Sequence, residues 1–266
     1  MPPCPGDASI EGTSLRDTER GRRGAEPSVD ELFAEALRAG ENVSRAREAL
    51  ERTQPDQTGM IALLRRAVPV RFLDVVAATP PWSDDPRVLG AVVRNPRAPR
   101  VLSLKLLPNL FWHDLAEVAA SPWIQGAVRA RAEGLLKEML SEMRLGERIT
   151  LGKIATPPVL PLLLVDAEPK VAEAALLNPR LREEDLLIQM RAAMVPVTLL
   201  EEVGRSPRWR ERYAVRLDLV LQPRTPLALA LAQVSSLVKR DLLRVAETPG
   251  LRPVVQAAAF RVAGEV

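Results

Sequence analysis

The stretch LAEVAASP, residues 115–122, decides the fold of this 266-residue chain, because its skeleton recurs along the sequence. The pattern is Leu-x-x-Val-small-x-Ser/Thr-Pro, and further copies are LDVVAATP at 73, LEEVGRSP at 200 and LLRVAETP at 242. A weaker copy, LLLVDAEP at 162, has Glu168 in place of the Ser or Thr. The five copies begin 42, 47, 38 and 42 residues apart. A period of this length is typical of helical-hairpin repeats.

Each part of the skeleton has a local physical reason. Leu115 and Val118 are three residues apart, so they share one face of a helix. Ala119 is small enough to allow a neighbouring helix to approach closely. Ser121 followed by Pro122 is typical of an N-cap and a first helical position, so we expect one short helix to end and the next to begin there.

A second marker follows the same period. NPR occurs at Asn95 and Asn178, and QPR occurs at Gln222. Residues 95–132 align with residues 222–259 without a gap, at an offset of 127, and 14 of the 38 positions are identical. We therefore expect each unit to contain a helix that ends near this marker, a second helix, and a short helix that ends at Ser/Thr-Pro.

Composition supports an all-α fold. Hydrophobic residues make up 47% of the chain but aromatic residues only 3%, so Leu, Ala and Val do the packing, and the 24 Pro fit many short helices with defined ends. One unit cannot bury its own apolar face, whereas stacked units can. The sequence thus predicts an α-solenoid of about five stacked HEAT-like units of about 42 residues.

Three regions are expected along the chain. Residues 1–27 are rich in Gly, Pro, Ser and charged groups and predict a disordered tail. Residues 28–67 predict an N-terminal helical cap, whose first helix is capped by Ser28 and stopped by Gly40. Residues 68–266 form the repeat region, with a last helix over residues 253–262 closing the end.

Two segments resemble a known family. DPRVLGAVVRNPRAPRVLSLKLL, residues 85–107, is similar to the leucine-rich repeat variant, a bacterial HEAT-like repeat, and EPKVAEAALLNPRLREEDLLIQM, residues 168–190, matches nearly as well. The resemblance implies a right-handed superhelix. The period of about 42 is longer than that family's unit. The cysteine cluster that can precede such repeats is absent, so no iron–sulfur site is carried over.

Several kinds of site and location are not expected. Cys4 is the single cysteine, no His, Asp and Glu cluster has metal spacing, and no phosphate loop occurs, so we expect no metal or cofactor. The N-terminus has no apolar run, and the longest one, around residues 158–165, is too short to cross a bilayer. The sequence is interpreted as that of a soluble, cytoplasmic protein that is not bound to a membrane.

Candidate catalytic and aromatic residues favour structural roles. His113 and Asp114 are neighbours, and neighbours on a helix point about 100° apart, so a catalytic pair is not expected. Asp114 and the matching Asp241 are interpreted as helix N-caps. Four tryptophans, at 82, 112, 123 and 209, are present, and the three that follow Ser/Thr-Pro are expected to pack at unit junctions. The acids at 183–185 suit the first turn of a helix.

The segment RSPRWRERYAVR, residues 205–216, carries the clearest functional signal. Arg208, Arg212 and Arg216 are spaced by four and would share one helical stripe, with Arg205 joining at its N-terminal end. From residue 205 onward the chain has 11 basic and 5 acidic residues, against 22 and 24 over residues 28–204. Such a stripe could contact phosphates or an acidic partner, or be a solvated face with local ion pairs.

Two functions follow from this pattern. The first is a non-catalytic scaffold that binds another protein along the surface of the solenoid. The alternative is a nucleic-acid-binding or DNA-repair-type helical repeat that uses the arginines at 205, 208, 212 and 216. An enzyme built on His113 and Asp114 ranks third, and the oligomeric state is not indicated by the sequence.

Overall fold

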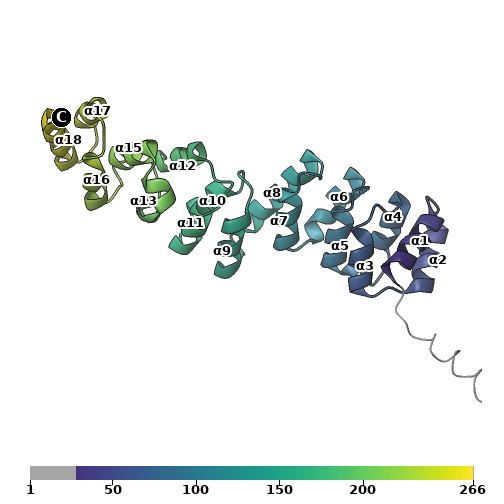
Figure 1. Ribbon diagram of the computed structural model, residues 1–266. Helices are drawn as coiled ribbons and strands as arrows, with labels where there is room; N and C mark the ends of the chain where they lie inside the picture. The colour runs from purple at the N-terminus through teal and green to yellow at the C-terminus, as the bar shows by residue number, and fades with distance from the viewer. Residues whose placement is uncertain (1–27, 266) are drawn as a thin grey trace, which may run out of the picture.

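The molecule is a row of short helices. The computed structural model describes residues 28–265, and within them the chain forms 18 α-helices, two 3₁₀ helices and no strand, which confirms the all-α prediction. Figure 1 shows the helices following one another along an elongated body, with α1 near one end and α18 at the other. Helices that pack against each other through several residues are at most three elements apart in chain order. The predicted tail, residues 1–27, lies outside the described residues.

The N-terminal end begins as predicted. Helix α1 (Val29–Ala39) starts at Ser28, whose hydroxyl accepts from the Glu31 backbone N–H while the Glu31 carboxylate accepts from the Ser28 N–H. This reciprocal capping box satisfies two backbone donors. Gly40 ends the helix with φ 57°, and α2 (Val43–Thr53) and α3 (Gln57–Leu64) follow.

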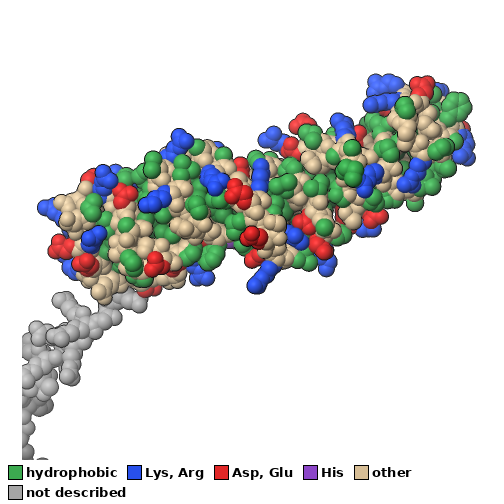
Figure 2. All heavy atoms as spheres, turned by 180° about the vertical axis from the view of Figure 1, so that it is seen from behind, with side chains coloured by type: hydrophobic (Ala, Val, Ile, Leu, Met, Phe, Trp, Pro, Cys, Tyr) green, Lys and Arg blue, Asp and Glu red, His purple; other side chains and the backbone are tan. Residues whose placement is uncertain are grey.

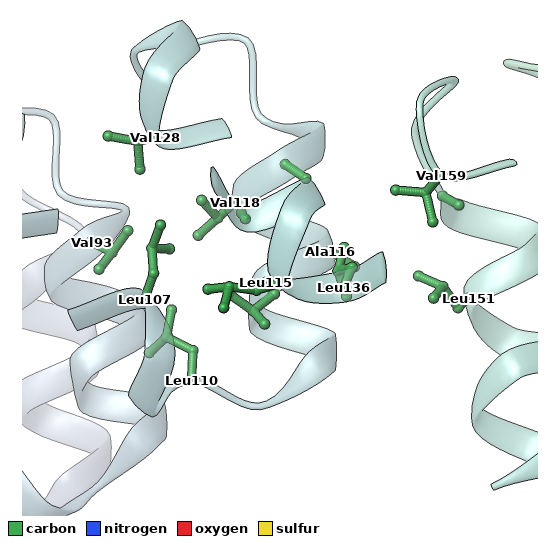
Figure 3. Close-up of a cluster of buried hydrophobic side chains, with 14 of the residues drawn as sticks. Val93, Leu107, Leu110, Leu115, Ala116, Val118, Val128, Leu136, Leu151 and Val159 are labelled. Atoms are coloured by element: carbon green, nitrogen blue, oxygen red, sulfur yellow. The ribbon is translucent and has the colours of Figure 1, made fainter. Parts of the chain in front are cut away.

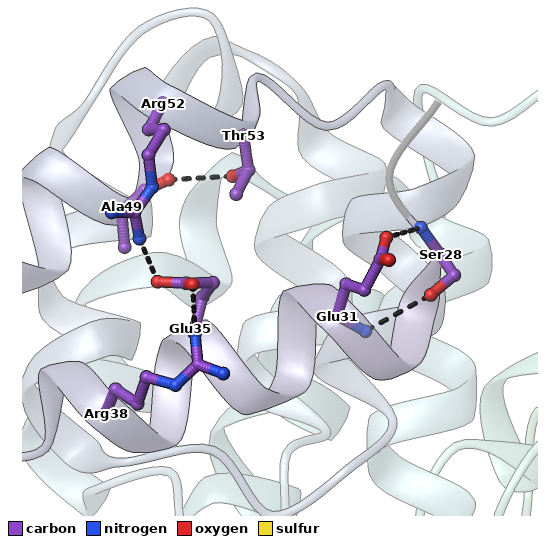
Figure 4. A network of polar contacts seen from close by, with 7 residues as sticks. All are labelled: Ser28, Glu31, Glu35, Arg38, Ala49, Arg52 and Thr53. Atoms are coloured by element: carbon purple, nitrogen blue, oxygen red, sulfur yellow. Dashed lines mark hydrogen bonds and ion pairs between the residues drawn. The ribbon is translucent and has the colours of Figure 1, made fainter. Parts of the chain in front are cut away.

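A polar network covers this end of the row. The Glu35 carboxylate on α1 accepts from Arg38 on the same helix and from Arg52 on α2, as Figure 4 shows beside the capping box. The Thr53 hydroxyl donates to the Ala49 carbonyl at 2.8 Å. The outermost helices therefore present charged and capped groups to solvent.

Three helices repeat as a group at three places after α4 (Val70–Ala78). The first helix of each group ends at the NPR or QPR marker, and the third ends at Ser/Thr-Pro, as predicted. The groups are α5 (Pro86–Val93), α6 (Arg100–Leu106) and α7 (Trp112–Ala120); α11 (Pro169–Leu176), α12 (Glu183–Met190) and α13 (Val197–Arg205); and α15 (Tyr213–Leu221), α16 (Leu227–Val234) and α17 (Lys239–Glu247).

The remaining elements fill the intervals. They are η1 (Trp82–Asp84), η2 (Leu107–Asn109), α8 (Gly126–Met139), α9 (Leu145–Ile154), α10 (Leu160–Leu164), α14 (Pro207–Arg210) and α18 (Pro253–Glu265). Helix α18 continues past the expected end at residue 262. Among the described residues, no helix combines the length and the hydropathy that crossing a membrane would need.

The skeleton leucines and valines form the core. In the copies at 73, 115, 200 and 242, each Leu and Val is 0 or 1% exposed. Leu115 and Val118 project into one cluster with Leu107 and Leu110 (Figure 3). Burying each such side chain contributes about 1.5–3 kcal/mol. The copy at 162 is out of register, because Leu162 is exposed whereas Leu160 and Leu163 are buried.

The marker amide joins consecutive parts of the row. Asn178, at 1% exposure, donates through Nδ2 to the Gly152 carbonyl at 2.8 Å and the Ala155 carbonyl at 3.1 Å, at the end of α9. Its Oδ1 accepts from the Arg180 backbone N–H at 2.8 Å. The last carbonyls of a helix have no partner within it, so this amide supplies one from the next unit.

The same arrangement occurs at the other two markers. Asn95 donates to the carbonyls of Leu64, the last residue of α3, and Arg66, both at 2.7 Å. Gln222 donates to the carbonyls of Met190, the last residue of α12, and Ala192 at 2.7 and 3.3 Å. The NPR and QPR markers therefore mark a repeated contact between successive units.

The Ser/Thr-Pro pairs end helices without starting new ones at three of the four copies, which corrects the sequence prediction. Ser121 is the C-cap of α7, and α8 begins five residues later, after a turn. Thr79 and Thr248 are also C-caps, and the Thr248 hydroxyl donates back to the Arg244 carbonyl at 2.7 Å. Only Ser206 directly precedes a helix, α14, and its hydroxyl makes no cap hydrogen bond.

The buried core is divided within α15. One cluster of buried side chains extends from Leu32 to Leu219, and a second extends from Val220 to Ala263. Leu219 and Val220 are adjacent on α15, so they point to different sides of the helix. The last group of helices thus packs around a core of its own.

Candidate arginine-lined groove

The expected arginine stripe is not a single helical face. Helix α13 ends at Arg205, α14 covers Pro207–Arg210, and α15 begins after Arg212. Pro207 cannot continue a helix, because it lacks the N–H and its ring blocks the preceding turn. The prediction of a continuous stripe from residue 205 to residue 216 is therefore wrong.

The Arg208 side chain is already engaged in hydrogen bonds within the protein. Its guanidinium donates to the Asn178 carbonyl at 2.8 Å and the Leu181 carbonyl at 3.1 Å, and it lies over the Trp209 ring at 4.5 Å from the centroid. These contacts bind α14 to the turn after α11. Arg208 serves as a structural bridge between units.

The other three predicted arginines have local partners. Arg205 pairs with Glu202 at 2.5 Å and Glu201 at 3.7 Å on its own helix. Arg212 lies 3.4 Å from Glu183, and Arg216 lies over the Tyr213 ring at 5.9 Å. The four arginines are therefore distributed over α13, α14 and the N-terminal part of α15, not along one helical face.

His113 and Asp114 face different neighbours. The exposed His113 has Nδ1 3.8 Å from a Glu117 carboxylate oxygen, whereas the buried Asp114 accepts from Arg94 Nη1 at 3.0 Å. The N-cap of α7 is Phe111, so Asp114 lies in the first turn, and the N-cap prediction is wrong. Residues 28–265 contain no group of three or more His, Cys, Asp or Glu side chains placed to hold a metal ion.

Asp241 has a comparable position in the last group. The N-cap of α17 is Val238, and the buried Asp241 lies in the first turn, where its Oδ2 accepts from the Tyr213 hydroxyl at 2.6 Å. The Val238 backbone N–H donates to the same hydroxyl oxygen at 3.2 Å. Burial, followed by the hydrogen bond to Asp241, raises the pKa of Tyr213 above its usual value.

The tryptophans divide into two kinds. Trp82 and Trp209 are buried as predicted, and the Trp209 indole N–H donates to the Leu176 carbonyl at 2.8 Å. Trp123 is 90% exposed, so its predicted packing role is wrong. The turn that follows Ser121 directs it away from the core. The acids at 183–185 do lie in the first turn of α12.

A groove with a volume of about 660 Å³ lies where α12, α15 and α17 meet. Its apolar lining includes Met190, Leu217 and Leu221, and its charged lining consists of Arg191, Asp218, Arg224 and Arg244. Leu217 and Leu221 are only partly buried and pack against the second core cluster. The groove therefore offers apolar surface beneath a rim of charge.

The groove carries an excess of positive charge. The buried Asp218 binds Arg191 through both carboxylate oxygens, at 2.6 Å to Nε and 3.3 Å to Nη2. Within residues 28–265, neither Arg224 nor Arg244 has a carboxylate at ion-pair distance. Three arginines and one aspartate give the lining a net charge of +2.

At the corresponding positions of the α5–α7 group, positive and negative charges balance each other. At the offset of 127, Glu117 corresponds to Arg244 and Arg97 to Arg224. The Glu117 carboxylate lies 2.5 Å from Arg94, and Arg97 lies 3.7 Å from Glu41. A hollow near Asn95 in that group has about 120 Å³. At these two positions the α5–α7 group thus lacks the unpaired positive charge that the groove carries.

Sequence reasoning missed this groove because its arginines come from three separate places, the turns after α12 and α15 for Arg191 and Arg224, and α17 for Arg244. The signal was present in the gapless match, where an acid at 117 becomes an arginine at 244. Figure 2 shows basic and acidic side chains interspersed along the face of the molecule that it presents. Comparison with family models, curated proteins and solved structures found no match to the chain.

Proposed function

We propose that this protein is a non-catalytic helical-repeat scaffold, which binds an acidic segment of a partner protein in the groove between α12, α15 and α17. The proposed architecture is a right-handed HEAT-like solenoid resembling the leucine-rich repeat variant. Its support is the marker amide, which makes the same contact with the preceding unit at Asn95, Asn178 and Gln222. Stacked units of this kind form extended binding surfaces.

The groove supports the choice of ligand. Arg224 and Arg244 have donors available to a carboxylate, and Leu217 and Leu221 offer apolar contacts below them. Charge complementarity selects the partner and the apolar contacts add affinity. A short extended peptide with two or more acids around an apolar residue fits this lining. The observation that carries the proposal is the unbalanced charge of the groove.

A peptide selection tests the proposal. A random peptide library is selected on the full chain and counter-selected on the Arg224→Glu/Arg244→Glu variant. We expect acidic peptides with an apolar residue, whose affinity for the double variant falls at least about tenfold, since one tenfold step corresponds to about 1.4 kcal/mol. The Arg87→Glu variant is the matched control, because Arg87 is exposed at the start of α5, far from the groove in the chain.

Two results would count against the proposal. The first is that selected peptides lack acids or bind the double variant as well as the wild type. The second concerns the nucleic-acid alternative, tested with labelled duplex DNA and single-stranded RNA at low salt. Binding to nucleic acid that weakens steeply with salt, with no peptide selected, would favour that alternative.

A further inference from the structure

A hollow beside Trp123 combines apolar and polar surface in the α5–α7 group. It has a volume of about 120 Å³ and lies between the turn after α5, the first part of α6 and the turn that leads into α8. Val93 and Val128, which line it, belong to the buried cluster that Figure 3 shows. An apolar cavity of about 150 Å³ holds benzene, so this hollow has room for about one ring.

Trp123 forms one wall of the hollow and is 90% exposed. Within residues 28–265 its indole N–H donates no hydrogen bond and its ring stacks on no other aromatic group. At the same place after the next Ser-Pro pair, Arg208 donates to two carbonyls of the turn after α11. Trp123 makes no such hydrogen bond to the turn after α5. Tryptophan is enriched among residues that dominate binding energies, so this exposure indicates a contact surface.

Ser103 supplies a polar group inside the hollow. It lines the hollow although the residue is only 3% exposed. Its backbone N–H donates to the Pro99 carbonyl, but within residues 28–265 its hydroxyl has no hydrogen-bond partner. The corresponding residues of the other two groups are Leu186 and Ala230, both buried and apolar, so the repeat does not require a hydroxyl here. A ligand in the hollow can supply the partner that a buried hydroxyl needs.

Arg100 sets the charge at the rim of the hollow. The lining contains two arginines and no acid. Arg94 is paired with Asp114 and Glu117. Within residues 28–265, Arg100 has no carboxylate at ion-pair distance and is exposed. An acidic residue beside the inserted group would therefore gain a charge-assisted hydrogen bond from Arg100.

We infer that this hollow is an anchor site for a tyrosine side chain of a partner protein, with an acidic residue next to that tyrosine. The phenol ring matches the size of the hollow and packs against the Trp123 ring. Its hydroxyl bonds with the hydroxyl of Ser103, and the neighbouring carboxylate accepts from Arg100. Phenylalanine would leave Ser103 without a partner, and an aliphatic side chain would lose the ring contact as well.

This site goes beyond the proposed function and does not depend on it. The hollow shares no lining residue with the groove between α12, α15 and α17. The two sites can therefore be tested separately, and failure of the peptide selection on the groove would leave the hollow untouched.

Fluorine NMR of the full chain labelled with fluorotryptophan tests the site. The probes are the peptides Asp-Tyr-Asp and Asp-Phe-Asp with blocked ends, and Trp123→Phe assigns the Trp123 resonance. We expect Asp-Tyr-Asp to shift that resonance and to bind about fivefold more tightly than Asp-Phe-Asp, because it gains one hydrogen bond. Ser103→Ala should make the two affinities equal. This variant keeps the fold, because alanine favours helix and already stands at the corresponding position 230.

Two charge reversals test the acidic neighbour. Arg100→Glu should weaken the binding of Asp-Tyr-Asp at least about tenfold, because it replaces an attraction by a repulsion. Arg87→Glu is the matched control, an exposed arginine outside the lining, and should change the affinity less than about twofold, because solvent and salt screen distant charges.

Three results would overturn the inference. They are a Trp123 resonance that does not move at millimolar peptide, equal binding of the two peptides to the wild type, and a preference for tyrosine that survives Ser103→Ala. Equal effects of Arg100→Glu and Arg87→Glu would overturn the assignment of the acidic neighbour.

Discussion

Replacing Asn178 by Ala should be among the most destabilising polar substitutions in the chain. The side chain donates to two carbonyls at the end of α9 and accepts from one backbone N–H. All three groups would lose their partner in a site that is 1% exposed, where water cannot replace it. At about 1 kcal/mol for each hydrogen bond, the free energy of unfolding should fall by about 3 kcal/mol.

Urea denaturation followed by circular dichroism at the helix minimum measures this loss. Gln222→Ala is the matched control, because it removes the corresponding amide from a partly exposed position with contacts of 2.7 and 3.3 Å. We expect it to cost about 1 kcal/mol. Asn178→Asp keeps the size but turns a carboxylate toward the two carbonyls, and should cost at least as much as the alanine. Equal losses at Asn178 and Gln222 would refute the reasoning.

Three further predictions concern packing and pH. Gly152→Ala should destabilise by about 1 kcal/mol, because its Cβ would lie 3.2 Å from the Ala175 backbone nitrogen, whereas Gly146→Ala on the same helix, with open space, should stabilise by about 0.5 kcal/mol. Trp209→Ala should lower the free energy of unfolding, measured by urea denaturation, by about 3–5 kcal/mol, because Trp209 is buried. Trp123→Ala should lower it by less than about 0.5 kcal/mol, because Trp123 is exposed. Similar losses for the two variants would contradict this difference in burial. Burial raises the pKa of Tyr213, so its contribution is present below pH about 10 and lost as pH rises further. Stability measured against pH should therefore decline more steeply above pH about 10 in the wild type than in Tyr213→Phe, and parallel curves would exclude this role.

The sequence was sufficient for the helices because their signals are local. Leu115 and Val118 lie on one face whatever surrounds them, and Ser28 with Glu31 forms a capping box without help from distant residues. The NPR marker was recognised by its recurrence. The hydrogen bonds that explain the marker could not be predicted, because the carbonyls that accept from Asn178 lie 23 and 26 residues earlier in the chain.

The candidate site was harder to predict, because only the three-dimensional fold decides which charged side chains lie close together. The spacing of Arg208, Arg212 and Arg216 suggested one face, but Pro207 and the turn at Glu211 changed the direction of the chain between them. Arg191, Arg224 and Arg244 have no sequence spacing in common, and only the meeting of three helices brings them to one groove. Partners such as Glu117 decide whether an arginine stays available, and pairing of this kind is not visible in composition.

The marker amides have a direction. Asn95, Asn178 and Gln222 each reach toward carbonyls that come earlier in the chain. During synthesis on a ribosome, the carbonyls to which each newly emerged amide donates have therefore been made already. The row can be assembled vectorially, with each segment fastened to a finished one as translation proceeds.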